Sequence, residues 1–383
     1  MDSRKVKSSK VLLIGFALFS MFFGSGNLIF PLIVGREVGQ HYIFGALGFI
    51  LTAVFVPFLG VVTMVVYGGD YRKFFAFLGD RLGFVVSFLL LLFWIPLGSG
   101  ARCVTLSFAS LQKTVNGSIP LWTFSFFYTL LVYIFTYRKD NIIKILGYIL
   151  TPLLLLCLGV VVGNGIWYMD FLNIGSKNID ESFLVGLYEG YNTMDLVASF
   201  FFSSTIIKLL SEETPEKHSS YNLRLVMKSG LVSVCMLGLV YLGLMFVAAA
   251  HAPLLENVAA EGLLVSFTYA LLGKEVGVVA AIAIALACLT TSIALASVFT
   301  EFIHKEIFSF RISYKKCLAL TCLLTFLISI LGFSAITSIY EPVFKIFYPA
   351  LMVMILVLVP LKVRSTKNKK CIPNSSVMPK NSF

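Results

Sequence analysis

The sequence predicts an all-α integral membrane protein of about ten transmembrane helices, arranged as a five-plus-five inverted repeat. Three observations carry this prediction. The 383 residues are 58% hydrophobic and only 13% charged, with a mean hydropathy of +0.92. Apolar runs of the roughly 20 residues needed to cross hydrocarbon recur along the chain. The first and sixth runs are interrupted by polar residues and glycine, at corresponding places in the two halves.

The apolar runs fill most of the chain and leave no room for a second domain. We expect spans at about 11–34, 43–67, 84–110, 121–137, 142–165, 183–207, 229–250, 276–300, 317–335 and 338–361. The transmembrane domain would cover residues 11–361, with repeat one at about 11–165 and repeat two at about 183–361. Residues 1–10 would form a cytoplasmic N-terminus and residues 362–383 a basic cytoplasmic tail. Because five is odd, the second repeat enters the membrane from the opposite side.

Basic residues are distributed unevenly between the two sides of the predicted membrane. Of the 30 Lys and Arg residues, all lie on one side except Arg36, Lys113, Lys177, Lys274 and Lys345, and Arg102 within a span. The positive-inside rule predicts a multi-pass protein of the cell (inner) membrane with both termini in the cytoplasm. The same distribution accounts for the net charge of +11 beside anionic lipid, so we expect the lipid bilayer as a partner and no nucleic acid.

The first span is interrupted by Gly24, Ser25, Gly26 and Asn27. Lipid offers no partner to an unpaired backbone group, so an open helix is tolerated only inside protein or beside a cavity. The amides around Ser25 to Asn27 could bind a substrate carboxylate at the positive end of the following half-helix. Carbonyls from Ser20 to Phe23 would face a cation. The alternative is close helix packing through small residues, which Asn27 and the nearby proline argue against.

The sixth span carries a second interruption, which ends at a carboxylate. Tyr191, Asn192, Thr193 and Met194 precede Asp195 and would line the substrate site opposite the first break. An ionisable residue within a span is costly and by default functional. Asp195 could complete a cation site, carry a coupling proton or pair with Arg102 of the third span.

The eighth span contains consecutive hydroxyl residues after Ala287 and Cys288. Thr290 and Thr291 would supply neutral oxygens, which suit Na⁺ beside main-chain carbonyls. The alternative is that these hydroxyls bond back to carbonyls of their own helix. The chain has seven cysteines but no CxxC pair, so we expect no disulfide framework, no metal site other than a coupling-ion site, and no cofactor.

These motifs resemble those of the bacterial branched-chain amino acid carriers, the BrnQ or LIVCS family of cation-coupled transporters. The resemblance rests on these stretches: Ala17 to Pro31 with Gly35 and Gly39, Arg102 to Phe108, Gly190 to Asp195, and Ala287 to Thr291. It implies a symporter, not an enzyme, that imports leucine, isoleucine and valine with Na⁺ or H⁺ by alternating access. It also implies a sodium site formed by the carbonyls of Ser20, Phe23 and Ala287 and the hydroxyls of Thr290 and Thr291.

Two questions stay open at this stage. Family members usually carry two more helices after the tenth span, where this chain has a basic tail, so assembly into oligomers is not predicted. The alternative function is cation-coupled transport of another small hydrophobic solute or amino acid. A channel would show polar faces along a pore, and a membrane-embedded enzyme would show a convergent catalytic set, and the sequence displays neither.

Overall fold

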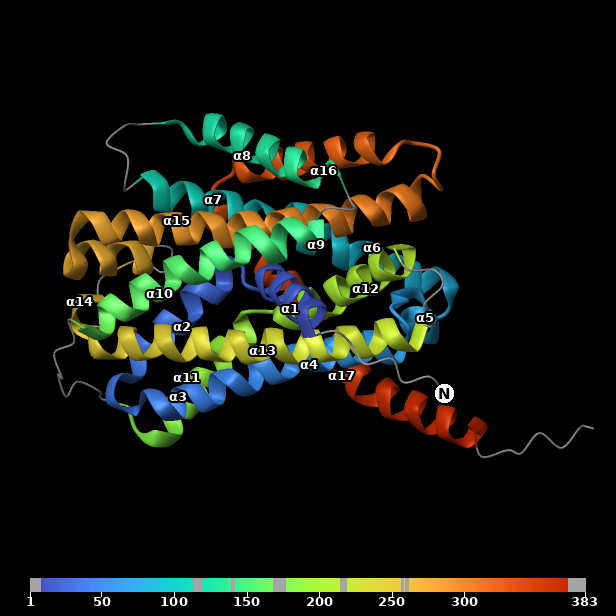
Figure 1. The fold of residues 1–383 in the computed structure, drawn as a ribbon, viewed down its shortest axis with the longest axis horizontal. Coiled ribbons are helices and arrows are strands. Elements are labelled where there is room, and N and C mark those ends of the chain that lie inside the picture. The colour runs from blue at the N-terminus through green and yellow to red at the C-terminus, as the bar shows by residue number, and fades with distance from the viewer. Residues whose placement is uncertain are drawn as a thin grey trace, which may run out of the picture.

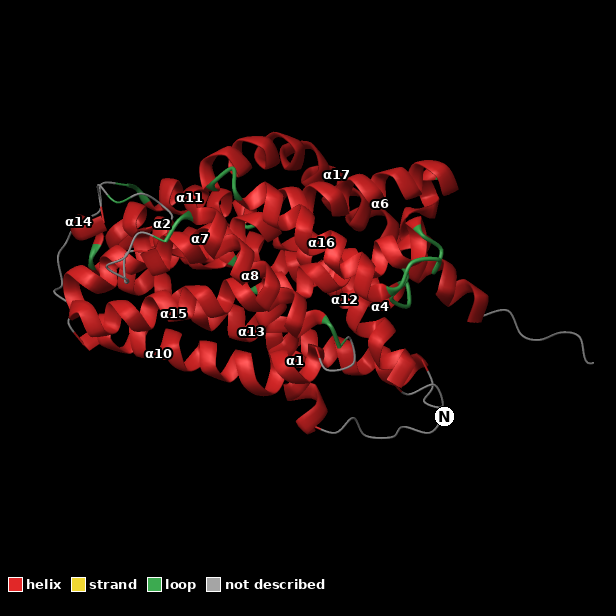
Figure 2. Cartoon of the chain, turned by 90° about the horizontal axis from the view of Figure 1, so that it is seen from above, coloured by secondary structure: helices red, strands yellow, loops and turns green. Residues whose placement is uncertain are grey.

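The protein is a bundle of long helices, seen here in a computed structural model that describes residues 8–112, 119–138, 142–167, 177–213, 219–255, 258 and 262–370. Each of the ten predicted spans corresponds to one or more helices. Figure 2 shows the described chain as helix joined by short loops, without a strand among the residues shown in colour. The predicted all-α architecture is therefore confirmed.

Repeat one contains the first five spans, three of them divided by a turn of π-helix and one by a break. Its helices are α1 (Ser8–Phe22), α2 (Ser25–Val38), α3 (Tyr42–Ile50), α4 (Val56–Val66), α5 (Tyr71–Phe75), α6 (Asp80–Trp94), α7 (Gly100–Gln112), α8 (Leu121–Thr136), α9 (Ile142–Ile145) and α10 (Thr151–Trp167). A π-helical turn, Ile95–Ser99, joins α6 to α7 in the third span. Helix α5 lies in the connection between the second and third spans.

Repeat two follows the same plan with longer helices. Its helices are α11 (Ile179–Asn192), α12 (Asp195–Glu213), α13 (Ser219–Ala250), α14 (Ala252–Leu255), α15 (Leu263–Phe302), α16 (Tyr314–Ser329) and α17 (Phe333–Lys370). Helix α15 is kinked at Gly273, whose φ of +78° is readily adopted only by glycine. The predicted boundary between the last span and the tail, at residue 361, falls inside α17. Residues 371–383 lie outside the described part of the chain.

Helix length agrees with a membrane-spanning bundle. In the described residues, six helical stretches are long and apolar enough to cross a bilayer. The pair α11 and α12 forms a seventh, bent by 42° at its break. Helices α1 and α8 are apolar but shorter. The break explains why α1 falls short, since the first span is divided between α1 and α2.

Helix packing shows the inverted repeat directly. The first span (α1 and α2) packs on α13 of the seventh span, and the sixth span (α11 and α12) packs on α3 and α4 of the second. The third and eighth spans contact each other, as do α8 and α16 of the fourth and ninth, which lie side by side at one edge in Figure 1. The contact of α10 with α15 is matched by that of α17 with α7. Exchanging the two halves therefore maps each of these contacts either onto itself or onto another contact of the same set.

Glycines allow the closest of these crossings. A Cβ atom at Gly186 of α11 would collide with the main chain of Gly45 in α3, and one at Gly48 would collide with the carbonyl of Phe183. A Cβ at Gly35 of α2 would likewise meet the carbonyl of Met245 in α13. Small residues therefore bring the backbones of spans 1 and 7, and of spans 2 and 6, into direct contact.

Candidate functional site

The helix of each broken span opens at two residues in the middle of the bundle. Phe23 and Gly24 separate α1 from α2, and Thr193 and Met194 separate α11 from α12. A Cβ at Gly24 would lie 3.1 Å from a side-chain carbon of Thr291, so glycine brings the first break against the eighth span. Met194 has φ of +56°, a left-handed conformation that is uncommon for a residue with a side chain. Both interruptions predicted from the sequence are confirmed.

Asn27 connects the two breaks through its side-chain amide. Its Oδ1 accepts a hydrogen bond of 2.8 Å from the main-chain N–H of Gly24, which lies at the opening of span 1. Its Nδ2 donates to a carboxylate oxygen of Asp195 and to the hydroxyl of Tyr241, with both distances 2.5 Å. The Tyr241 hydroxyl also lies 3.3 Å from the same carboxylate oxygen. One buried amide therefore connects the start of α2, the start of α12 and α13.

The end of α1 directs main-chain carbonyls toward Thr291 of the eighth span. The hydroxyl oxygen of Thr291 lies 3.3 Å from the carbonyl oxygen of Ser20, 3.4 Å from that of Met21 and 3.1 Å from that of Phe23. A hydroxyl has one proton, so it cannot donate fully to all of these acceptors at once. The result is a cluster of neutral oxygens at the C-terminal end of a half-helix, the arrangement that coordinates cations in broken-helix transporters.

Thr290 differs from the sequence-based expectation. Its hydroxyl donates a hydrogen bond of 2.9 Å to the carbonyl of Ala287, so both predicted ion ligands are paired with each other inside α15. Neighbouring residues of a helix point in directions about 100° apart, and only Thr291 reaches the end of α1. The alternative reading, a bond back to the same helix, therefore describes Thr290, and the ion-site reading fits Thr291.

A small cavity of about 30 Å³ lies where the two breaks meet, which is room for about two water molecules. Its lining includes six of the predicted substrate residues: Gly24, Ser25, Gly26, Asn27, Thr193 and Met194. Asp195, Thr291 and Arg102 line it as well. Apolar side chains complete the walls, among them Phe30, Trp94, Phe202 and Leu295. The cavity thus combines helix ends and opposite charges with an apolar surface.

Two predicted substrate residues lie elsewhere. The ring of Tyr191 packs edge-on against that of Tyr348, with centroids 4.9 Å apart, and Asn192 donates a hydrogen bond of 3.3 Å to Glu189. Neither residue lines the cavity. Both precede the break and belong to the last turn of α11, whereas the residues at the break itself face the cavity.

Arg102 does not form the ion pair with Asp195 that the sequence left open. Its guanidinium carbon lies 5.3 Å from the ring centre of Phe333 and 5.5 Å from that of Tyr340, both on α17. Among the residues that the structure describes, no carboxylate lies within ion-pair distance of this side chain.

Several residues of the site were not identified from the sequence. The aromatic walls Trp94 and Phe202 could not be distinguished from the many other aromatic residues that face lipid or the core. Tyr241, which contacts Asn27 but does not line the cavity, did carry a signal, because it is the one tyrosine in a long apolar run and a buried tyrosine hydroxyl usually has a polar partner. That partner is Asn27.

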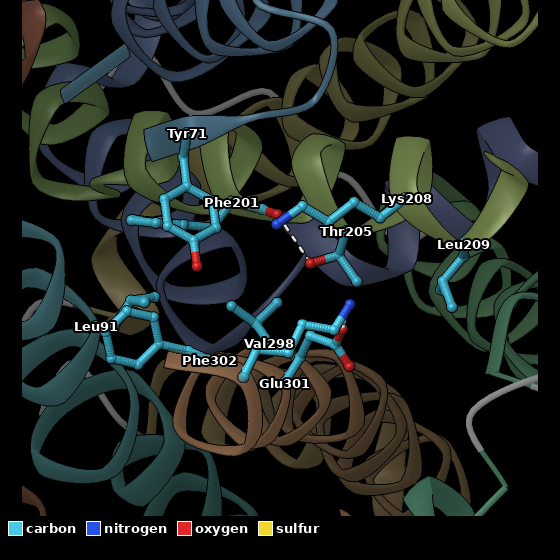
Figure 3. Close-up of a pocket in the computed structure, with 10 residues that line it drawn as sticks. Tyr71, Leu91, Phe201, Thr205, Lys208, Leu209, Val298, Glu301 and Phe302 are labelled. Atoms are coloured by element: carbon cyan, nitrogen blue, oxygen red, sulfur yellow. Dashed lines mark hydrogen bonds and ion pairs between the residues drawn. The ribbon is translucent and has the colours of Figure 1, made fainter. Parts of the chain in front are cut away.

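A second cavity lies along the same helices, farther toward the end of the bundle that carries α5. It is lined by Phe201, Thr205 and Lys208 of α12 and by Val298, Glu301 and Phe302 of α15, together with Tyr71 of α5. Figure 3 shows Tyr71 and Lys208 on one side and the α15 residues on the other. The Lys208 ammonium lies 4.3 Å from the centre of the Tyr71 ring. Burial raises the pKa of the Tyr71 hydroxyl, which keeps that ring neutral beneath the cation.

Ion pairs lie at this second cavity, which Glu301 and Lys305 line, and they connect three elements. Lys305, just after α15, pairs with Glu301 and lies 3.6 Å from Glu212 of α12. Arg72 of α5 pairs with Glu306. The half-helix α12 is thereby tied to the end of the eighth span, below the two breaks.

Comparison with known proteins identifies the family. Residues 7–378 match the family described as branched-chain amino acid transport protein. Relatives include proteins of Staphylococcus aureus (strain USA300) and Staphylococcus saprophyticus, both provisionally named as branched-chain amino acid carrier proteins. The first is 29% identical over 92% of this chain and 83% of its own length, and the second 27% identical over 93% and 83%.

Two solved structures share the fold. MhsT in complex with L-phenylalanine superposes with a TM-score of 0.58 at 15% identity, over 92% of this chain and 89% of MhsT. A Na⁺-coupled sialic acid symporter gives 0.58 at 15% identity, over 91% of this chain and 79% of the symporter. These likenesses confirm the predicted inverted-repeat fold, and the family match confirms that the protein is a carrier and not an enzyme. The chain belongs to the branched-chain amino acid transport protein family.

Proposed function

We propose that this protein is a secondary active symporter that imports leucine, isoleucine and valine together with Na⁺ by alternating access. The observation that carries the proposal is the convergence of three carbonyls at the end of the first half-helix, those of Ser20, Met21 and Phe23, on the Thr291 hydroxyl, beside two helix breaks that Asn27 connects. A cation at the carbonyl cluster would fix the end of α1 against α15. The substrate would occupy the adjoining cavity, with its side chain against the apolar walls.

Coupling follows from this adjacency. The carbonyls that would hold the cation and the amides that would face the substrate carboxylate belong to opposite sides of one break, at Phe23 and Gly24. Ordering the break with a cation therefore prepares the amides of α2 for the substrate. Because the cavity is only about 30 Å³, it must widen to admit an amino acid, and the free energy of both ligands would stabilise the widened form.

We propose that the protein lies in the inner membrane, with both termini and α5 on the cytoplasmic side. The ion pairs of Lys305 and Arg72 then close the cytoplasmic side of the site. Release into the cell requires α12 to separate from the end of α15, which breaks these contacts and opens the route through the second cavity. We further propose the domain division predicted above, with residues 11–361 as the transport unit.

A proton is the second candidate coupling ion, and a specific observation favours it. Asp195 is a buried carboxyl group at the junction of the breaks, where Asn27 and Tyr241 are its hydrogen-bond partners. A carboxyl group in that position could carry a proton from one side of the membrane to the other. Under this alternative, the carbonyl cluster would have a structural role only.

The proposal is tested by uptake of labelled leucine into liposomes that contain the purified protein. We expect accumulation when an inward Na⁺ gradient is imposed without a proton gradient, and counterflow when unlabelled leucine is inside. Accumulation driven only by a proton gradient would transfer the coupling role to Asp195. No uptake of any branched-chain amino acid by folded protein would leave another small hydrophobic solute as the substrate, and uptake without counterflow would indicate a channel.

A further inference from the structure

Arg102 is the charged residue of the cavity whose role the proposed function does not require. It lies in α7, within the third span, where a cation costs free energy, and such residues are by default functional. Arg102 lines the same cavity as the start of α2 and Asp195. Its Nε atom is buried and has no hydrogen-bond partner.

The contacts of the guanidinium leave its donors available. The guanidinium carbon lies over the rings of Phe333 and Tyr340, 5.3 and 5.5 Å from their centres, and these contacts do not neutralise its charge. An arginine carries five N–H donors in a fork that matches a carboxylate in two parallel hydrogen bonds. In the part of the chain that the structure describes, no carboxylate is within ion-pair distance to accept them.

The charges of the cavity match a zwitterion. Among its lining residues, Arg102 is the one Lys or Arg and Asp195 the one Asp or Glu. Asp195 already accepts hydrogen bonds from Asn27 and Tyr241, so it is held in place at the break of span 6. The positive end of α2 begins at Ser25, in the same lining. A ligand with one carboxylate and one ammonium can therefore satisfy the two charges and the helix end together.

We propose that Arg102 binds the carboxylate of the substrate and thereby restricts transport to solutes that carry a free carboxylate. The inference rests on the proposed function, since it assigns a residue to the substrate that this function names. It also links occupancy of the site to the tenth span, because the carboxylate and the rings of α17 contact the same guanidinium. A solely structural Arg102 would hold α17 in place and would not distinguish one ligand head group from another.

The test compares leucine with leucinamide, which keeps the side chain and the ammonium but lacks the carboxylate. In the wild type, leucinamide should compete with labelled leucine uptake roughly 10- to 100-fold less well than leucine does, the size expected for lost hydrogen bonds to a charged group. In Arg102→Gln the KM for leucine should rise by a similar factor, and the ratio between the two competitors should fall toward one. Arg311→Gln removes the same charge from an exposed turn and should leave both values unchanged.

The competitor ratio decides between the readings. If Arg102→Gln keeps the wild-type ratio, the proposal is wrong, whether or not uptake is weaker overall. If Arg102→Gln does not fold, Arg102→Lys replaces it: a higher KM with unchanged kcat supports carboxylate binding, and an unchanged KM overturns it. Absence of leucine uptake by the wild type would instead overturn the proposed function, and this inference with it.

Discussion

Asn27 has the most demanding environment of any single residue in the site. Its amide satisfies the N–H of Gly24 at one break and the carboxylate of Asp195 at the other, and all of these groups are buried. Removing a partner from a buried charged or polar group costs more than the bond itself contributes, because the remaining group stays unsatisfied. The contact between the breaks therefore depends on this side chain.

We expect Asn27→Ala to lower leucine uptake at least tenfold and to lower the free energy of unfolding by about 1–3 kcal/mol, since a buried carboxylate loses its donor. Uptake in liposomes and thermal unfolding in detergent measure the two effects. Asn164→Ala is the matched control, because that amide bonds to the Val160 carbonyl of its own helix and lies far along α10 from the breaks. Equal effects of the two substitutions would contradict the role given to Asn27.

The residue types in the sequence were enough to identify the polar groups of the site, but not which of these groups pair with each other. Asn27 and Asp195 were identifiable because lipid makes a polar side chain in a span conspicuous. Their mutual bond could not be predicted, since it depends on how far α2 and α12 overlap across the bundle. For the same reason the sequence left open a pair between Arg102 and Asp195, whereas the guanidinium lies over two rings of α17.

At the scale of elements, the breaks were predicted to within a residue or two. Glycines at 24 and 26 mark the first opening, which the structure places at Phe23 and Gly24. The second opening at Thr193 and Met194 lies inside the predicted polar stretch. The predicted role of Tyr191 and Asn192 stays without support from the cavity because both belong to the last turn of α11, whereas Thr193 and Met194 at the break line it.

Close crossing of α3 and α11 can be tested at Gly186. A methyl group there would collide with the Gly45 main chain, so Gly186→Ala should push the helices apart and destabilise the protein by about 1–3 kcal/mol. Gly159→Ala is the control, because no heavy atom lies within 4 Å of a Cβ at that position in α10. It should leave stability unchanged or raise it by up to about 1 kcal/mol, since alanine favours helix. If thermal unfolding shows that both substitutions lower the stability equally, this packing is contradicted.

At the scale of the whole molecule, topology followed from the sequence and the shape of the cavity did not. Ten apolar runs and two interruptions were enough to predict five helices plus five in opposite orientations; helix contacts repeat between the halves, and the likeness to solved structures confirms the inverted-repeat fold. The walls of the cavity come from α1, α2, α6, α7, α12, α15 and α17 and from the two breaks. Which aromatic side chains face inward depends on the rotation of each helix, and a chain with 36 phenylalanines gives no local signal for it.

The ion pairs at the end of the bundle that carries α5 also depend on the whole molecule. Lys305, Glu212, Arg72 and Glu306 come from three separate elements and meet only in the folded bundle. In the sequence they are charged residues near loops, and nothing there distinguishes them from the other charges on the predicted cytoplasmic side. They lie on α5, at the end of α12 and in the π-helical turn after α15, and under the proposed mechanism an inward opening would separate them.

The measurement that tests the central claim most directly is the Na⁺ dependence of leucine uptake in the wild type, Thr291→Val and Thr290→Val. Valine keeps the shape of threonine and removes the hydroxyl. We predict saturable activation by Na⁺ in the wild type and an increase of roughly tenfold or more in the Na⁺ concentration for half-activation in Thr291→Val, from the loss of one coordinating oxygen. Thr290→Val should stay close to wild type, because its hydroxyl serves the Ala287 carbonyl. Equal Na⁺ dependence in all three proteins, or uptake that does not depend on Na⁺, would contradict a Na⁺ site at Thr291.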